Sequence, residues 1–307
     1  MSSDSLNYIR FWGVRGSYPA PYGSHLRVGG NTSCVELRVN NHILICDGGS
    51  GIIPLGQSLL AEEPEIKEVT ILLSHYHWDH ISGLPFFAPA FLPDWKVNIY
   101  GPGDSKEEIE MRVSGQMTDP YFPVAVEVWS AEINYLKAYA SQLEYGPFKV
   151  ENFSVHHPGS TFGYKIQVKN KTIIYASDNE ITFVEEVIAE DNLEPEELEL
   201  FKAMQEEEQE RYIEIIENAQ VLIHDAQYTP EDYAKKRGWG HSCYIDTANL
   251  AIDAHVKQLY LFHIDPNYDD NKVEALHRDI MKLVHQKKLN LNCKIAREGL
   301  IVDIDQL

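Results

Sequence analysis

The sequence predicts an α/β (α+β) protein, and three observations support this fold class. Strand-like and helix-like segments alternate along all 307 residues, as expected when helices pack on β-sheets. The strand-like segments are short, apolar and rich in β-branched residues, which is typical of buried strands. The chain contains no Gly/Ser tract, Pro-rich run or internal repeat that would separate domains. We therefore expect a single domain over residues 1–307.

The expected elements follow one another closely. Strands are expected at residues 8–15, 33–39, 42–46, 69–73, 96–100, 148–155, 162–168, 172–176, 221–223, 258–262, 293–296 and 300–304. Helices are expected at residues 52–61, about 105–117, 244–254 and 270–286. The stretch 118–147 has mixed signals, with strand-like residues at 124–129, and is placed only loosely.

Local signals support these boundaries. Asn40 and Asn41 predict a hairpin turn between two strands. Asp104 or Ser105 is a suitable N-cap for the helix that follows. Asp47 opens a glycine-rich turn, where a capping role and a functional role are about equally well supported. Asp47 is therefore not assigned as a metal ligand.

An acidic segment stands out between residues 190 and 217. It carries twelve acidic residues with interleaved apolar ones, which predicts one or two amphipathic helices with a solvated face. We expect it to form an acidic helical insertion at about residues 181–218, and a second insertion at about residues 84–147. Either insertion could support a homodimer.

Charge and cysteine usage narrow the class of protein. The net charge of −21 repels polyanions, so a long nucleic acid and an anionic membrane are disfavoured as partners. No apolar run approaches the roughly 20 residues of a membrane helix, and the N-terminus has no apolar signal core. The four cysteines show no Cys-x-x-Cys spacing. We therefore expect buried free thiols in a reducing cytoplasm.

The most informative stretch is Ser-His-Tyr-His-Trp-Asp-His at residues 74–80, directly behind an apolar strand. His75 and His77 are two positions apart, so both imidazoles can face one point. Asp79 and His80 would begin a helix and face a second point nearby. Imidazole and carboxylate ligands suit zinc, manganese or iron, and no thiolate is close enough for a structural zinc site. This spacing predicts two neighbouring metal ions, although a single histidine is more often an ordinary core or surface residue.

Other strands end in the same residue types. Histidine or aspartate follows apolar strands at positions 157, 178, 225 and 263. Because α/β enzymes build sites from strand ends at one sheet edge, these side chains are expected to gather there.

The motifs HYHWDH, HHPGSTFGY, SDNE, HDAQY, GWGHS and LFHIDP, in this order, resemble the metallo-β-lactamase superfamily. The match is to the phosphodiesterase-like branch that includes ribonuclease Z, and the openings FWGVRGSYPAP and GGNTSCVEL also resemble that branch. The resemblance implies a four-layer αβ/βα sandwich with two divalent metal ions, first of all zinc, at the shared edge of two sheets.

The resemblance also implies the roles of individual residues. The first metal would be held by His75, His77 and His157, the second by Asp79, His80 and His263, with Asp178 bridging both. His157 is preferred over His156 because of its spacing to Gly163-Tyr164. His241 would stand beside the scissile phosphate, oriented by Asp225, where the family more often has glutamate. A helix-capping or surface role remains the alternative for His241.

The expected reaction is hydrolysis of a small phosphodiester, such as a cyclic nucleotide, by a hydroxide that bridges the two metals. Asp79 and the His241-Asp225 pair are the expected catalytic groups, with His241 as the acid. Aromatic residues near the motifs could stack on a base or simply belong to the core: Trp78, Phe86, Phe87, Phe91 and Trp239. The alternatives are hydrolysis of a thioester, lactone or lactam, an RNA-processing endonuclease, and a metal-bound sensor without catalysis.

Overall fold

Two seven-stranded β-sheets form the centre of the computed structural model, which describes residues 7–62, 65–138, 142–182, 195–286 and 291–307. The first sheet has the order β14-β1-β2-β3-β4-β5-β6, and the second has the order β13-β12-β11-β10-β9-β8-β7. The strands of the first sheet are β1 (Tyr8–Gly13), β2 (Cys34–Val39), β3 (His42–Cys46), β4 (Glu68–Leu72), β5 (Lys96–Gly101), β6 (Glu132–Lys137) and β14 (Ile301–Asp303). Those of the second are β7 (Leu143–Tyr145), β8 (Phe148–Ser154), β9 (Phe162–Val168), β10 (Lys171–Ala176), β11 (Val221–Asp225), β12 (Gln258–Phe262) and β13 (Asn292–Ile295).

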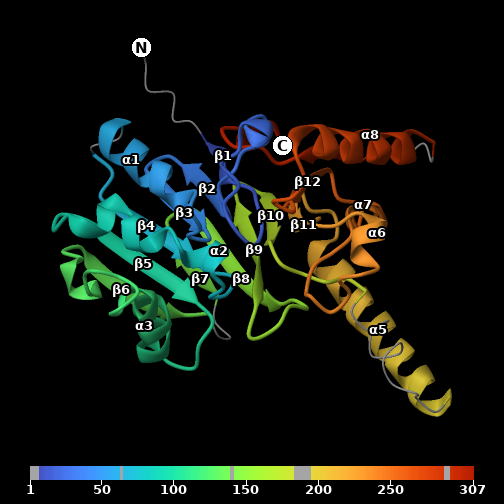
Figure 1. The fold of residues 1–307 in the computed structure, drawn as a ribbon, viewed down its shortest axis with the longest axis horizontal. Helices are drawn as coiled ribbons and strands as arrows, with labels where there is room; N and C mark the ends of the chain where they lie inside the picture. Colours follow the sequence, from blue (N-terminus) through green and yellow to red (C-terminus); the bar gives the residue numbers. More distant parts are fainter. Residues whose placement is uncertain (1–6, 63–64, 139–141, 183–194, 287–290) are drawn as a thin grey trace.

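Helices cover the outer faces of both sheets (Figure 1). The helices are α1 (Ile52–Glu62), α2 (Trp78–Ile81), α3 (Lys106–Ser114), α5 (Pro195–Ile216), α6 (Pro230–Tyr233), α7 (Tyr244–Asp253) and α8 (Asp270–Gln286). Helices α1 and α3 contact the first sheet, whereas α7 and α8 contact the second. The result is the predicted four-layer αβ/βα sandwich.

Both sheets combine parallel and antiparallel pairs. Strands β3, β4, β5 and β6 are mutually parallel in the first sheet, and β10, β11, β12 and β13 are parallel in the second. A continuous core lies between the sheets, where Phe11 packs on Tyr260 with ring centroids 5.2 Å apart. Tyr164 also donates a hydrogen bond across the sheets to the carbonyl of Leu73 at 2.5 Å. Residues that follow the parallel strands β4, β10 and β12 lie close together, so the carboxyl ends of these strands meet along one shared edge.

The structure differs from the sequence prediction mainly in the segment 84–147. This segment supplies β5 and β6 of the first sheet and β7 of the second. Strands β6 and β7 were not predicted, because β6 is an edge strand with partly exposed side chains and β7 has only three residues. The strand-like signal at 124–129 was wrong, since Val126–Val128 form a 3-10 helix.

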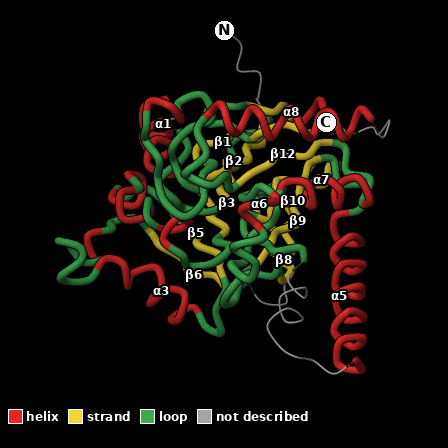
Figure 2. The backbone as a smooth tube through the Cα atoms, turned by 45° about the vertical axis from the view of Figure 1, so that its right-hand side comes forward, coloured by secondary structure: helices red, strands yellow, loops and turns green. Residues whose placement is uncertain are grey.

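The acidic segment forms one long helix in its described part. Helix α5 projects from the body of the molecule in both views (Figures 1 and 2), and residues 183–194 of the expected insertion lie outside the described residues. Among the described helices, none is long and apolar enough to cross a membrane.

Candidate metal centre

The predicted site residues come together at the shared edge of the two sheets. His75 and His77 follow β4, and the short helix α2 carries Asp79 and His80. The second sheet contributes the others from the ends of its strands: His157 after β8, Asp178 after β10, Asp225 at the end of β11 and His263 after β12. Strand β4 ends at Leu72, so the first two histidines lie in the loop beyond it rather than in the strand itself.

One group consists of His75, His77, His157 and Asp178, and the atoms they offer as ligands all lie within 4.8 Å of one another. Asp178 Oδ2 lies 3.7 Å from His75 Nε2 and 3.6 Å from His157 Nε2. His157 Nε2 is also 3.0 Å from His77 Nδ1. Three imidazoles and one carboxylate oxygen thus face a single point.

The second group consists of Asp79, His80, Asp178 and His263, and all four are buried. Asp178 faces it with its other oxygen, because Oδ1 lies 3.0 Å from His80 Nε2 and 3.3 Å from His263 Nε2. Asp79 Oδ2 is 3.0 Å from His263 Nε2. Asp178 therefore lies between the two groups and presents one carboxylate oxygen to each.

Hydrogen bonds to the rings of four histidines turn their Nε2 atoms toward the centre of the site. In four of them Nδ1 donates to a fixed acceptor, which leaves Nε2 without a proton in the neutral ring. The pairs are His75 with Ser74 Oγ (3.0 Å), His80 with Asp47 (2.7 Å), His157 with the Gly240 carbonyl (2.9 Å) and His263 with Gln227 Oε1 (2.9 Å). His80 Nε2 and His263 Nε2 then face each other at 3.3 Å. In neutral rings these two lone pairs would repel each other, so a positive charge is needed beside them, which a metal ion held by this donor set would supply.

The charges at the site support the same conclusion. Burial lowers the pKa of His75 well below its usual value and that of His157 to about 4, so both rings are neutral, as metal ligands must be. Burial alone would lower the pKa of His80 as well, but the surrounding carboxylates, Asp178 first, raise it well above its usual value. The buried carboxylates thus favour a positive charge at this point. Among the described residues, neither group includes a cysteine, which suits zinc, manganese or iron in a site of nitrogen and oxygen ligands.

Asp47 has a role that the sequence did not reveal. Its backbone is left-handed, with φ of 62°, and its side chain is fully buried. Besides His80, its carboxylate accepts hydrogen bonds from the Ser74 backbone N–H at 2.7 Å and from Tyr175 Oη at 2.7 Å. Asp47 is therefore neither a helix cap nor one of the grouped ligands, but it fixes the ring of His80 from behind.

We expect Asp47→Asn to weaken metal binding by roughly 10- to 100-fold. The asparagine carries no charge, and it orients the His80 ring less firmly than a carboxylate does. The measurement is a competition titration of the metal against a chromophoric chelator. Tyr175→Phe is the matched variant, because it leaves the Asp47–His80 pair in place and should change the affinity much less. Equal affinities of Asp47→Asn and the wild type would rule out this role.

His241 and Asp225 form a buried pair next to these groups. His241 Nδ1 lies 2.7 Å from Asp225 Oδ2 and 3.9 Å from Asp178 Oδ2. Asp225 also accepts hydrogen bonds from the backbone N–H groups of Gln227 and Ser242 at 3.0 and 3.1 Å. Asp225 thus reaches His241, although aspartate is shorter than glutamate. His241 does not cap a helix, because the N-cap of α7 is Cys243. Burial lowers the pKa of His241 and raises that of Asp225.

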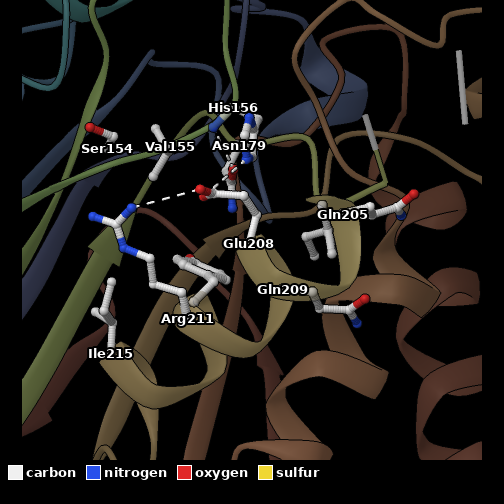
Figure 3. Close-up of a pocket in the computed structure, with 11 residues that line it drawn as sticks. Ser154, Val155, His156, Asn179, Gln205, Glu208, Gln209, Arg211 and Ile215 are labelled. Carbon is white, nitrogen blue, oxygen red and sulfur yellow. Dashed lines mark hydrogen bonds and ion pairs between the residues drawn. The ribbon is translucent and has the colours of Figure 1, made fainter. Parts of the chain in front are cut away.

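The two adjacent histidines at the end of β8 point to different places. His157 faces the metal-ligand groups, whereas His156 Nε2 lies 3.9 Å from Glu208 Oε2 on α5. Figure 3 shows His156, Asn179 and Glu208 around a small cavity of about 40 Å³ between α5 and the second sheet. The structure therefore places His157, and not His156, among the candidate ligands.

The aromatic residues named from the sequence divide into two sets. Phe87 is buried and Phe91 packs against the core, so neither is available for stacking. Trp78, Phe86 and Trp239 are 76%, 54% and 60% exposed. Trp78 and Trp239 adjoin His77 and the Gly240-His241 turn in sequence, which keeps them as candidates for substrate contacts.

The loop that follows β1 also contacts the candidate site, which no sequence signal indicated. The backbone N–H of Ser17 donates to Asp79 Oδ2 at 2.6 Å. A Cβ atom on Gly16 would lie only 2.4 Å from the His263 ring, so this loop can approach the ring only with glycine at that position.

Comparison with known proteins agrees with this geometry. Two mixed sheets in a four-layer sandwich, with histidines and aspartates gathered at one edge, define a metallo-β-lactamase fold. Residues 46–264 match the protein family described as "Beta-lactamase superfamily domain", and the chain belongs to this family.

The sequence relatives cover most of the chain, and the solved structures cover nearly all of it. A ribonuclease Z from Oceanobacillus iheyensis is 24% identical over an alignment of 286 residues, and the match covers 82% of this chain and 90% of the relative. The metallo-β-lactamase fold protein YhfI from Bacillus subtilis superposes with a TM-score of 0.66 at 17% identity, covering 98% of this chain and 100% of YhfI. Unliganded yeast PDE1 has a TM-score of 0.63 at 16% identity, with coverages of 98% and 100%. At these identities the structural likeness establishes the fold.

Proposed function

We propose that this protein is a phosphodiesterase that uses two divalent metal ions, with zinc as the first choice and manganese or iron as alternatives. The first ion would be held by His75, His77 and His157, and the second by Asp79, His80 and His263. The observation that carries the proposal is Asp178, whose two oxygens face the two groups separately, at 3.6 Å from His157 and 3.0 Å from His80. A carboxylate in this position can bridge two cations.

Two divalent ions, when bound, supply positive charge beside the phosphoryl oxygens and lower the pKa of water toward about 7. The chain itself would add the proton that the leaving group needs. Asp225 holds Nδ1 of His241, which leaves Nε2 to give a proton to the leaving oxygen as its bond to phosphorus breaks. Burial lowers the pKa of His241, whereas the negative charge of a bound phosphodiester acts in the opposite direction.

We further propose a small phosphodiester, such as a cyclic nucleotide, as the substrate. The net charge of −21 disfavours a long polyanion. Trp78 lies between the proposed ligands His77 and Asp79 in sequence, and Trp239 lies two residues before His241. Both side chains are exposed, and an exposed indole offers a face on which a base can stack. We also propose that the protein acts in the cytoplasm and forms a homodimer.

The second candidate is an RNA-processing endonuclease. The relatives named ribonuclease Z favour it, in tension with the acidic composition. One local feature also favours it: Lys235 and Arg237 are exposed on the segment that leads to Trp239 and His241. Basic and aromatic side chains side by side are typical of surfaces that hold single-stranded nucleic acid.

A substrate panel with metal-loaded protein tests both candidates. We expect hydrolysis of bis-p-nitrophenyl phosphate and of at least one cyclic nucleotide, little effect of moderate salt, and no cleavage of a structured RNA. Cleavage of the RNA with a steep loss of activity between 50 and about 200 mM salt would favour the endonuclease. Turnover of a thioester or lactone without turnover of any diester would overturn the proposal.

A further inference from the structure

Glu180 is a buried carboxylate that binds a segment far away in the sequence. It follows β10 two positions after Asp178 and is 1% exposed. Its Oε1 accepts hydrogen bonds from the Gly238 backbone N–H and from Tyr233 Oη, both at 2.9 Å. Its Oε2 accepts from the Gly240 backbone N–H at 2.8 Å. One side chain thus holds the segment 233–240 near both of its ends.

The backbone of this segment is shaped to receive a carboxylate. Gly238 and Gly240 have φ of 75° and 83°, a left-handed conformation that favours glycine. When residues with left-handed and right-handed backbone conformations alternate, neighbouring backbone N–H groups can donate to one anion. Here the two glycine N–H groups flanking Trp239 both point to Glu180, so the carboxylate fills an anion-binding turn.

The turn supports two side chains of the proposed site. The Gly240 carbonyl accepts the Nδ1 hydrogen bond of His157 at 2.9 Å, and His241 is the next residue. The contact is close, because a Cβ atom on Gly240 would lie 2.3 Å from His157 Nδ1. A shift of this turn would therefore move the carbonyl that orients His157 and the backbone that places His241.

We propose that Glu180 is a positioning residue that orients His157 and His241 at once by holding the turn 238–240. The kinetic part rests on the proposed function, whereas the structural part can be tested without any substrate. The prediction concerns hydrogen-bond geometry rather than charge. Glutamine keeps the shape but has only one acceptor oxygen, so its amide group would meet one of the two glycine N–H donors. Aspartate keeps the charge but is one methylene shorter.

The first experiment measures amide hydrogen exchange at Gly238 and Gly240 in the full-length protein. Both amides should exchange faster in Glu180→Gln and in Glu180→Asp, while the amides of β10 and β11 keep their protection. The matched control is Glu36→Gln, which alters a buried carboxylate in the first sheet that accepts from Trp12 and Arg38. This control should leave the turn protected. Unchanged exchange at both glycines in Glu180→Gln, or wild-type behaviour of Glu180→Asp, would overturn the proposal.

The second experiment is a double-mutant cycle of Glu180→Gln with His241→Ala on bis-p-nitrophenyl phosphate. Glu180→Gln alone should lower kcat by roughly 10- to 100-fold, with a clearly smaller loss in the His241→Ala background because the two changes disrupt one arrangement. Equal losses in both backgrounds, at unchanged metal content, would contradict the positioning role. A wild-type protein without diesterase activity would count against the proposed function only, since the exchange result stands by itself.

Discussion

Replacing His241 with alanine is expected to lower kcat for a phosphodiester by roughly 10²- to 10⁴-fold, the usual contribution of a positioned acid or base. The bound metal should stay at the wild-type amount, because His241 belongs to neither of the two groups proposed to hold the ions. The measurement combines initial rates on bis-p-nitrophenyl phosphate with elemental analysis of the same preparations.

The matched control for this prediction is His156→Ala. His156 lies at the same end of the second sheet, but its ring is directed to Glu208, so its loss should change neither rate nor metal content. A proton donor also predicts that the wild-type rate falls as rising pH removes the proton of His241, and that this pH dependence disappears in His241→Ala. Unchanged turnover in His241→Ala would refute the acid role.

Asp178→Asn is expected to have the largest effect of any single substitution. Asp178 is the only residue shared by both groups, and the amide offers neither the charge nor the two equivalent oxygens that face His157 and His80. Loss of metal charge at the reacting phosphate removes several kcal/mol of transition-state stabilisation, which corresponds to at least roughly a thousandfold in rate. We expect substoichiometric metal and activity near the background.

Thermal unfolding gives a second measurement of the Asp178 prediction. Metal that binds only the folded state raises the unfolding temperature, so a chelator should lower the Tm of the wild type. The same treatment should leave the Tm of Asp178→Asn unchanged. If Asp178→Asn retained two metal ions per chain and responded to the chelator like the wild type, Asp178 would not be the bridging ligand.

Most of the fold could be predicted because its strands are short apolar runs bounded by turns. The runs at β4, β11 and β12 are buried between layers, so their composition alone marks them. Strand β6 could not be found this way, because an edge strand packs on one side only and its side chains are partly exposed. Strand β11 also continues to Asp225, beyond the predicted end at residue 223, because its last two residues, His224 and Asp225, are polar. Of these two, Asp225 faces the site, where it contacts His241.

The candidate ligands could be named because imidazole and carboxylate groups concentrate at strand ends. The residues that orient them could not, since their role depends on contacts between distant parts of the chain. Asp47 is 33 residues from His80, and Glu180 is 60 residues from Gly240. The sequence around such a carboxylate is the same whether it caps a nearby turn or binds a residue that is distant in the chain.

The position of the candidate ligands in both sheets has a consequence for biosynthesis. His75 emerges from the ribosome early, but His263, which directly follows β12, the last strand that contributes to the site, emerges only after most of the chain has been made. Neither sheet alone carries all the residues proposed to hold the two ions. If the two ions bind as proposed, the second can be held only after β12 has been translated and the two halves have docked, so a truncated or stalled chain would not retain the pair.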